Sequence, residues 1–451
     1  MKVGFYEAEI TPPLGAPIPG YFFERIACGV SRKLFAKAVV LEDNGVYTAM
    51  VCVDALGIPE GLDVVVRQSV AERTPIDPES ILITATHSHT SIPTEVSRKF
   101  DEATKQRVQT IIDTTSKRAA DAVVLAYQRL QEADVFYANR EVKGVSFCRN
   151  CVLKNGEVRT NPFDYVEDVV RTAREPRRPF TILFFRDKNG NPIGSISSFA
   201  LHHDNVGTSE YDSDYSGGMG LRLKDTYGQD FVSVFFSGFN GDINRIDFMN
   251  KEDPRHVPSH QVVDTLTDAF LEMASTAEKM DNTAIAYKMG TTTVEKRKIP
   301  DGFVESVKEV LKGPEPEPTY DDQGNRVDKI TDPYCDNQKY ASGEIVLKTY
   351  DEDKRTEIDL PVQAIKFGDC MFYGLVGEQF SEFAENICDG SPSDKNFTVS
   401  MCHFYNSVSY FPTAHMFHPH VYESTYYSAR FEPDTGDRMV KRVLELGHEI
   451  Y

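Results

Sequence analysis

The sequence predicts an α/β fold with mixed sheets, in which strand hairpins are flanked by helices and functional groups lie at the carboxyl ends of strands. Two observations predict it. Apolar strand pairs are joined by tight polar turns, and segments with apolar residues spaced by three and four lie between them. With 451 residues, the chain exceeds the ~250–300 at which one core usually stops growing. We expect one large elaborated domain over residues 1–451, with two closely joined domains as the alternative.

Three predicted hairpins share one design, in which the second strand ends on polar residues that could carry function. Asn-Gly and Gly-Asp pairs between apolar runs favour such hairpins because their residues tolerate positive φ. The hairpins are residues 34–41 and 47–53 with a turn at 43–45, ending at Asp54; residues 180–185 and 193–201 with a turn at 189–190, ending at His202 and His203; and residues 360–367 and 371–376 with a turn at 368–369, ending at Gly377 and Glu378.

A fourth strand is predicted over residues 81–86. It follows a helical pattern at 62–73 and ends on His87-Ser88-His89. Because ligands and catalytic groups collect at strand ends in α/β sheets, histidines and acids at several such ends indicate one shared crevice.

Further helices and one polar insertion complete the predicted organisation. Residues 312–344 are rich in Pro, Asp and Gly, which favours a surface insertion, a lid or a boundary. The remaining helical patterns lie at 102–131, 216–227, 261–280, 304–311, 380–387 and 437–446.

Composition excludes several classes of partner. The formal net charge of −20 repels phosphate backbones, so nucleic acid is not expected as a partner. No stretch reaches the ~18 apolar residues of a membrane helix, and Met1 is not followed by a basic leader. As written, the chain is expected in the cytoplasm, or outside it if a leader has been removed. The 8 cysteines are scattered, which favours reduced core residues over a disulfide framework, and Cys148 with Cys151 is a weak metal or redox signal.

The histidines predict a metal site. Alternate residues of a strand face one side, so His87 and His89 are expected to point together into the crevice, as two ligands or as one ligand and one acid/base. A hydrogen-bonded surface pair is the alternative. Only one of His202 and His203 can face inward, and we assign His202. With Glu378, the set supplies imidazoles and a carboxylate suited to catalytic zinc with an open position for water.

A second histidine cluster lies near the C-terminus and could form a rival metal site. It consists of His415, His418 and His420. Pro412 and Pro419 interrupt it and no strand end positions it, so a role in a loop is favoured.

Several short motifs occur in order between about residue 5 and residue 423. Together they resemble motifs of the neutral/alkaline (non-lysosomal) ceramidase family. They are Glu9-Ile10-Thr11-Pro12-Pro13-Leu14-Gly15 with Gly20-Tyr21, Ala85-Thr86-His87-Ser88-His89-Thr90, Phe199-Ala200-Leu201-His202, Gly241-Asp242, Gly377-Glu378-Gln379-Phe380, Asn406-Ser407-Val408-Ser409-Tyr410 and Tyr422-Glu423.

This resemblance implies a role for each matching residue. His89 would be an acid/base or oxyanion partner beside the metal, and Arg149 would contact the substrate. The roles of Tyr410 and Arg149 depend on the resemblance alone. The implied zinc ligands are His87, His202, Glu378 and Tyr410.

The chain also departs from the family pattern. Asn244 stands where the family has a serine, which removes a serine nucleophile but not a zinc-activated water. Asn244 could still form a hydrogen bond in the pocket, and Asp242 is expected to orient a histidine. The chain ends soon after the last motif, so we expect a short, bacterial-type member without the family's C-terminal immunoglobulin-like domain.

These observations favour a zinc-dependent hydrolase that cleaves an amide bond of a small or lipid-like N-acyl, ceramide-like substrate. His89 would move protons, while zinc, Arg149 and Tyr410 would stabilise the oxyanion. Three alternatives remain: a degenerate family member that binds metal or ligand without catalysis, a hydrolase of another amide or an ester, and a serine or cysteine hydrolase that uses Ser88 or Cys148.

Overall fold

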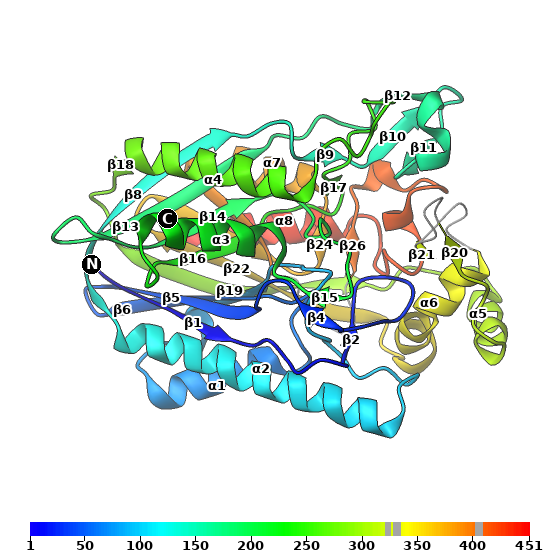
Figure 1. Ribbon diagram of the computed structural model, residues 1–451, viewed down its shortest axis with the longest axis horizontal. Coiled ribbons are helices and arrows are strands. Elements are labelled where there is room, and N and C mark those ends of the chain that lie inside the picture. Colours follow the sequence, from blue (N-terminus) through cyan, green and yellow to red (C-terminus); the bar gives the residue numbers. More distant parts are fainter. Residues whose placement is uncertain (321–325, 328–334, 402–408) are drawn as a thin grey trace.

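The computed structural model describes residues 1–320, 326–327, 335–401 and 409–451. Two sheets pack face to face, and helices cover the outer face of each (Figure 1). This mixed α/β architecture confirms the predicted fold class. The larger sheet has 9 strands in the order β16-β14-β13-β8-β1-β5-β6-β7, with β18 on β8. Its strands are β1 (Lys2–Glu9), β5 (Phe35–Asp43), β6 (Val46–Val53), β7 (Ile81–Ala85), β8 (Gln131–Glu141), β13 (Pro179–Asp187), β14 (Pro192–Phe199), β16 (Val232–Ser237) and β18 (Glu278–Lys279).

The larger sheet consists of two halves that meet at one corner. The register between β1 and β8 joins Lys2 to Glu132 and Val3 to Gln131. In addition, β16 at the end of one half contacts β5, β6 and β7 of the other. The sheet is therefore strongly curved, which brings the loop after β7 and the loop after β14 to one place.

The second sheet has 4 strands in the order β19-β22-β23-β25. Its central strand β23 is apolar on both faces because one face meets the larger sheet and the other meets helices. In β23, for example, Met371, Phe372 and Tyr373 are all buried. The strands are β19 (Ile285–Glu295), β22 (Glu357–Phe367), β23 (Cys370–Leu375) and β25 (Lys395–Ser400).

The outer helices divide between the two sheets. Helices α1 and α2 cover one half of the larger sheet, and α3 and α4 cover the other half, on opposite sides of Figure 1. Helices α7 and α8 lie on the smaller sheet. The helices are α1 (Leu62–Arg73), α2 (Glu102–Gln128), α3 (Asp214–Tyr227), α4 (Ser259–Thr276), α7 (Ser381–Gly390) and α8 (Thr435–Ile450).

All three predicted hairpins are confirmed. In the first, Asp43 pairs with Val46 across Asn44 and Gly45, whose φ values are 52° and 82°. Positive φ at both central residues belongs to the turn type that matches the twist of paired strands. In the third, Phe367 pairs with Cys370.

Some elements differ from the prediction. Helix α2 ends at Gln128 and α4 at Thr276, each followed by a strand that the helical pattern had absorbed in part. Five further strands of the two sheets were not predicted. They are β1, β8, β16, β19 and β25.

The predicted polar insertion at 312–344 contains the first residues of a helix that its composition did not indicate. Helix α6 (Asp336–Val346) packs on α5 (Phe303–Lys312), and both project from one end of the molecule (Figure 1). The turn-forming composition of residues 313–318 therefore marks a connection between two helices. Residues 321–325 and 328–334 lie outside the described residues.

Short elements surround the end of the molecule where the strand-end loops gather. They are β2 (Pro17–Ile18), β3 (Arg25–Ile26), β4 (Gly29–Val30), β9 (Phe147–Cys148), β10 (Asn150–Leu153), β11 (Val158–Thr160), β12 (Val169–Thr172), β15 (Glu210–Tyr211), β17 (Ile243–Asn244), β20 (Thr319–Tyr320), β21 (Arg326–Val327), β24 (Glu378–Gln379), β26 (Tyr410–Phe411), η2 (Phe163–Asp168), η3 (Leu347–Glu352), η4 (Ala414–Met416) and η5 (Tyr422–Ser424). At the opposite end, η1 (Pro78–Ser80) leads into β7.

No helix within the described ranges is long and apolar enough to cross a membrane. The cysteines of these ranges are free thiols, including Cys148 and Cys151, as predicted. Cys402 lies outside the described residues.

The strand-end carboxyl of Asp54 gives a test of the fold. Burial raises its pKa to about 6, from an ordinary 3.8, although the backbone N–H of Phe35 donates to it. The folded protein therefore binds this proton more tightly than the unfolded chain, so the carboxyl lowers stability as pH rises from about 4 to about 6. In Asp54→Asn this dependence disappears. As pH rises over this range, the parent is therefore expected to lose about 3 kcal/mol in free energy of unfolding relative to the variant.

Denaturant unfolding at several pH values between 4 and 7 measures this difference. A difference that is flat across the range would contradict the effect assigned to Asp54.

Candidate active site

His87 lies two residues after β7 in a turn. Its φ is 69°, a left-handed value that is uncommon for a residue other than glycine. The expectation that His87 and His89 share a strand face is therefore wrong in its reason, because β7 ends at Ala85. The two rings still converge, with centroids 5.0 Å apart, and His202 joins them at 4.6 Å and 5.1 Å.

Each of the three histidine rings is held by a backbone carbonyl. Nδ1 of His87 lies 2.6 Å from the Leu56 oxygen, and Nδ1 of His89 lies 3.1 Å from the Gly20 oxygen. Nδ1 of His202 lies 3.4 Å from the Asn240 oxygen. A carbonyl oxygen only accepts, so each Nδ1 carries a proton, and in a neutral ring the lone pair is then on Nε2.

The three Nε2 atoms face a common point. Nε2 of His87 and Nε2 of His202 are 3.2 Å apart. The ligand-capable nitrogens of His87, His89 and His202 all lie within 4.8 Å of one another. No other group of three or more such side chains is this close in the part of the chain that the structure describes.

Glu378 adds a carboxylate to the same point. Its Oε2 lies 3.1 Å from Nε2 of His87 and 3.8 Å from Nε2 of His202. Residue 378 is on β24, which pairs in parallel with β26 so that Glu378 lies opposite Tyr410. The loop after β23 and the segment before η4 thus bring the predicted acid and the predicted phenol together.

The charges at this site favour a cation. Burial, followed by neighbouring positive charge, lowers the pKa of both His89 and His202 well below the usual value, so these rings are neutral near pH 7. Burial raises the pKa of Glu378, but His87, Tyr410 and Arg149 together lower it by more. The net pKa is below the usual value, so the carboxylate remains ionised. His89 Nε2 is buried with no hydrogen-bond partner among the described residues. Neutral imidazole nitrogens and an ionised carboxylate oxygen fit a metal ion.

His203 points away from this cluster. Its ring stacks on Tyr215 with centroids 4.0 Å apart and meets Phe235 edge-on at 5.6 Å. Its backbone oxygen accepts from the N–H of His89. The assignment of His202 as the inward residue therefore agrees with the geometry.

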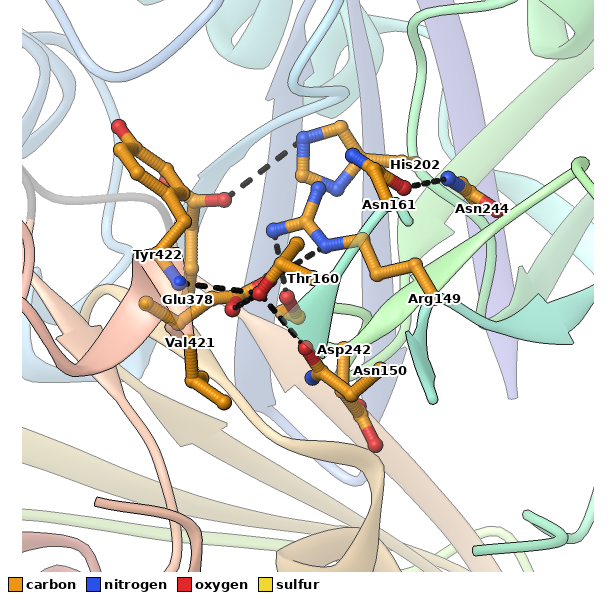
Figure 2. Close-up of polar contacts among 12 residues, drawn as sticks. Arg149, Asn150, Thr160, Asn161, His202, Asp242, Asn244, Glu378, Val421 and Tyr422 are labelled. Carbon is orange, nitrogen blue, oxygen red and sulfur yellow. Dashed lines mark hydrogen bonds and ion pairs between the residues drawn. The ribbon is translucent and has the colours of Figure 1, made fainter. Parts of the chain in front are cut away.

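Arg149 reaches the site from the turn between β9 and β10. Its Nε donates to Oε1 of Glu423 at 2.6 Å, and a terminal nitrogen donates to the Gly241 oxygen at 2.7 Å. Its guanidinium carbon lies 5.5 Å from the ring centroid of Tyr410. Burial lowers the pKa of Arg149, but Glu423, Tyr410 and Glu378 raise it by more, so the group stays charged. Figure 2 shows Arg149 between His202 and Thr160.

Glu423 and Thr160 were not predicted as functional residues. The hydroxyl of Thr160 lies 2.6 Å from Oε2 of Glu423 and 2.7 Å from Oδ1 of Asn150, and it accepts from the N–H of Tyr422 (Figure 2). Glu423 is fully buried and carries the charge opposite Arg149. In the sequence, the match of Tyr422-Glu423 to a motif was the available signal.

Asn244 lies beside this group, on β17. Its Nδ2 donates to Oδ1 of Asn161 at 2.9 Å, and its Oδ1 accepts from the N–H of Ile246 at 2.9 Å. The predicted hydrogen bonding of Asn244 is thus made to the neighbouring loop, and both ends of its amide are used.

Asp242 lies against a helix terminus rather than a histidine. Its two carboxylate oxygens accept from the N–H and the hydroxyl of Ser381, at 2.7 Å and 2.9 Å. Ser381 is the first residue of α7. Asp242 therefore satisfies the N-terminal N–H of this helix and fixes the chain just after Glu378.

The N-terminal loop closes another side of the site. The Tyr21 hydroxyl donates to Oδ1 of Asp204 at 2.8 Å, and the Arg25 guanidinium lies 3.8 Å from the Tyr21 ring centroid. Arg25 also donates to the His89 backbone oxygen at 2.5 Å. Tyr21 was a motif residue, whereas Arg25 and Asp204 carried no signal.

The rival histidines take surface positions. Nε2 of His415 lies 3.4 Å from Glu382, and Nε2 of His420 lies 4.0 Å from Glu157. These two are thus bound to different elements, in keeping with the predicted loop role. The motif residues Asn406, Ser407 and Val408 lie outside the described residues.

Comparison with known proteins connects this geometry to a family. Residues 1–215 match the family described as neutral/alkaline non-lysosomal ceramidase, N-terminal, which confirms the predicted resemblance over this part of the chain. No curated protein sequence matches the chain.

Solved structures are similar in fold. The crystal structure of neutral ceramidase from Pseudomonas aeruginosa superposes with a TM-score of 0.71 at 16% identity, covering 99% of this chain and 74% of that one. A ceramidase complexed with C2 superposes with a TM-score of 0.68 at 15% identity, with the same coverage of both chains.

Gly377 offers a test of how Glu378 is placed. Its φ is 82°, and an added Cβ would lie 2.5 Å from the Ser409 oxygen and 2.4 Å from the Phe411 ring. Gly377→Ala is expected to separate β24 from β26 and displace Glu378. If the cluster binds a divalent metal ion, its affinity should fall by about 10-fold or more, because misplaced ligands bind metal weakly. Titration against a chromophoric chelator measures the affinity.

Gly190→Ala is the matched control. Its φ is 87°, but nothing lies within 4 Å of an added Cβ. An equal loss of affinity in both variants would show that backbone strain, and not the position of Glu378, is responsible.

Proposed function

From the match of residues 1–215 to the neutral/alkaline ceramidase family and from the geometry of the site, we propose that this protein is a zinc-dependent hydrolase of an N-acyl, ceramide-like amide. The observation that carries the proposal is the convergence of ring nitrogens of His87, His89 and His202, two of which lie within 3.8 Å of the Glu378 carboxylate. The catalytic unit in this proposal is one domain over residues 1–451.

His87, His202 and Glu378 would hold the metal, with Tyr410 as the fourth ligand. Imidazole nitrogens and one carboxylate are the donors of catalytic zinc sites. Burial and the charge of Glu378 raise the pKa of Tyr410 well above its usual value, so without metal its phenol stays protonated. When bound, zinc would polarise a carbonyl group and activate water for attack at neutral pH.

His89 is proposed as the residue that moves protons. Its Nδ1–H is held by the Gly20 carbonyl, and its buried Nε2 has no donor or acceptor among the described side chains. This nitrogen is neutral and faces the metal cluster, so it can accept a proton from attacking water and return it to the leaving amine. His89 would thus act beside the ligands rather than as one of them.

Arg149 is proposed to stabilise the oxygen that becomes negative during attack. Glu423 and the Gly241 carbonyl fix its guanidinium, and burial removes competing water. A preorganised positive donor has most effect at this step because it needs no reorganisation. Tyr410 lies close enough to share this role.

Asn244 supports water as the nucleophile. Its amide is not nucleophilic, and both of its ends are bonded within the loop. Ser88 is a poor alternative because it is fully buried and donates to the Asp212 oxygen at 2.9 Å. Burial raises the pKa of the Cys148 thiol to about 12, which disfavours the reactive thiolate.

A degenerate protein that binds metal without catalysis is the second candidate, and the residue that favours it is Asn244. An ester or a different N-acyl amide is the alternative substrate. Stoichiometric zinc with no turnover of acyl amides or esters would favour the degenerate protein. Activity that survives removal of metal by chelators would contradict both metal-based candidates.

The histidines are expected to separate by function. His87→Ala and His202→Ala each lose bound zinc and hydrolysis of N-acyl amides of short and long chain. His89→Ala keeps about one zinc per chain but loses about 10²- to 10⁴-fold in kcat, the usual contribution of an acid/base. Metal analysis of the purified variants and steady-state kinetics measure the two effects.

His203→Phe is the matched control because His203 packs between aromatic rings. It should keep both zinc and activity. Loss of zinc from His203→Phe, together with retention in His202→Ala, would overturn the ligand assignment.

Arg149→Lys is expected to keep zinc and lower kcat by about 10²- to 10³-fold, because lysine cannot reproduce the two fixed donor directions of the guanidinium. Steady-state kinetics and metal analysis measure the change. Arg255→Lys, at an exposed arginine stacked on Phe163, serves as the control. If kcat is unchanged in Arg149→Lys, this residue does not stabilise the oxyanion.

A further inference from the structure

A buried polar network lies between the loop that carries His87 and His89 and the loop that carries His202. Its first part is residue 212, whose backbone oxygen accepts from the hydroxyls of Ser88 and Thr90, both at 2.9 Å. The backbone N–H of residue 212 in turn donates to the Thr90 oxygen at 2.8 Å. The residues on both sides of His89 are therefore bound to Asp212.

The second part of the network is Asp214, which binds the other loop. Its Oδ2 accepts from the backbone N–H of Asn205 at 2.8 Å, and its Oδ1 accepts from the Asn205 side-chain amide at 2.9 Å. The same amide donates to the backbone oxygen of His202 at 2.9 Å. One carboxylate thus holds the turn that begins at His202.

The two parts are joined by further bonds. Oδ1 of Asp212 accepts from the backbone N–H of Asp214 at 2.7 Å. The Arg32 guanidinium donates to the same oxygen at 2.9 Å and to the backbone oxygen of Asp214 at 2.7 Å. Asp212 and Asp214 are fully buried and Asn205 is nearly so, which makes this network rigid and costly to break.

The backbone at Asp214 is held in an unusual conformation. Its φ is 55°. Of the four non-glycine residues with positive φ within the described ranges, His87, Asn161 and Asp214 surround the site, whereas Asn44 is in a distant hairpin. Such conformations persist where the surroundings determine them, and they cluster at functional sites. Glycine would adopt this φ more easily, so the side chain of Asp214 is what the position requires.

We propose that Asp212 and Asp214 are positioning residues that form a clamp between the 87–90 loop and the 202–205 loop. The clamp sets the distance between His87, His89 and His202 and so makes the cluster able to hold one ion. This inference rests on the proposed function for its zinc readout, but the clamp itself is a property of the metal-free protein.

The first experiment compares Asp214→Gly and Asn205→Ala with the parent. Glycine satisfies the positive φ but removes the acceptors, so a role in backbone geometry alone would leave zinc binding unchanged. The clamp predicts a loss of about 10- to 100-fold in zinc affinity in each variant, measured on the full chain by competition with a chromophoric chelator.

The double variant should lose little more than either single one, because both act through the same bonds. Asp214→Asn, which retains one acceptor oxygen, should fall between the parent and Asp214→Gly.

The second experiment is independent of metal. Hydrogen exchange of the metal-free protein, read by mass spectrometry, should be faster in peptides covering 86–91 and 202–206 for Asp214→Gly than for the parent. Asn44→Gly, at the distant positive φ, should leave both peptides and the zinc affinity unchanged. Unchanged exchange in Asp214→Gly overturns the clamp. Faster exchange in a protein that binds no zinc, even as the parent, supports the clamp and contradicts the proposed function.

Discussion

Four atoms that can bind a metal lie together at the centre of this structure. They are ring nitrogens of His87, His89 and His202 and Oε2 of Glu378. Neutral His202 and ionised Glu378 present lone pairs to each other 3.8 Å apart, and burial removes the water that would screen their repulsion. A cation at this point would turn that repulsion into attraction. Much of the surrounding structure can therefore be understood as the means by which the chain keeps these atoms together.

Backbone groups hold most of these atoms in place. Carbonyls of Leu56, Gly20 and Asn240 each fix one ring, and each comes from a different loop at the same end of the curved sheet. Buried side chains bind the loops in turn. Asp242 accepts from the first residue of the helix after Glu378, and Asp214 accepts from the turn after His202. Because loop backbone has no ladder of its own, these polar contacts take the part that sheet hydrogen bonds play elsewhere.

The fold was predictable where local chemistry determines it. Asn44-Gly45 and Gly368-Asp369 specify hairpin turns, and α1 has the predicted ends. Strands β8 and β19 were missed because most of their residues are partly or fully exposed, which leaves few apolar positions to mark a strand. The proposed site residues were predicted from strand ends and motifs. The same signals could not predict Glu423, Asp214 and Asn205. The contacts that make these residues important join distant parts of the chain, and a sequence pattern does not contain them.

Asn244 sharpens the chemistry of the site. A serine at this position would offer a hydroxyl near Arg149, but the asparagine directs both ends of its amide into its own loop and that of Asn161. The hydroxyl that remains in this region, that of Thr160, is held by Glu423 and Asn150. Under the proposed function, attack on a carbonyl carbon therefore comes from water, and the proton released has a receiver in Nε2 of His89. In that case the asparagine leaves the proposed hydrolytic groups in place and changes the groups that meet the substrate.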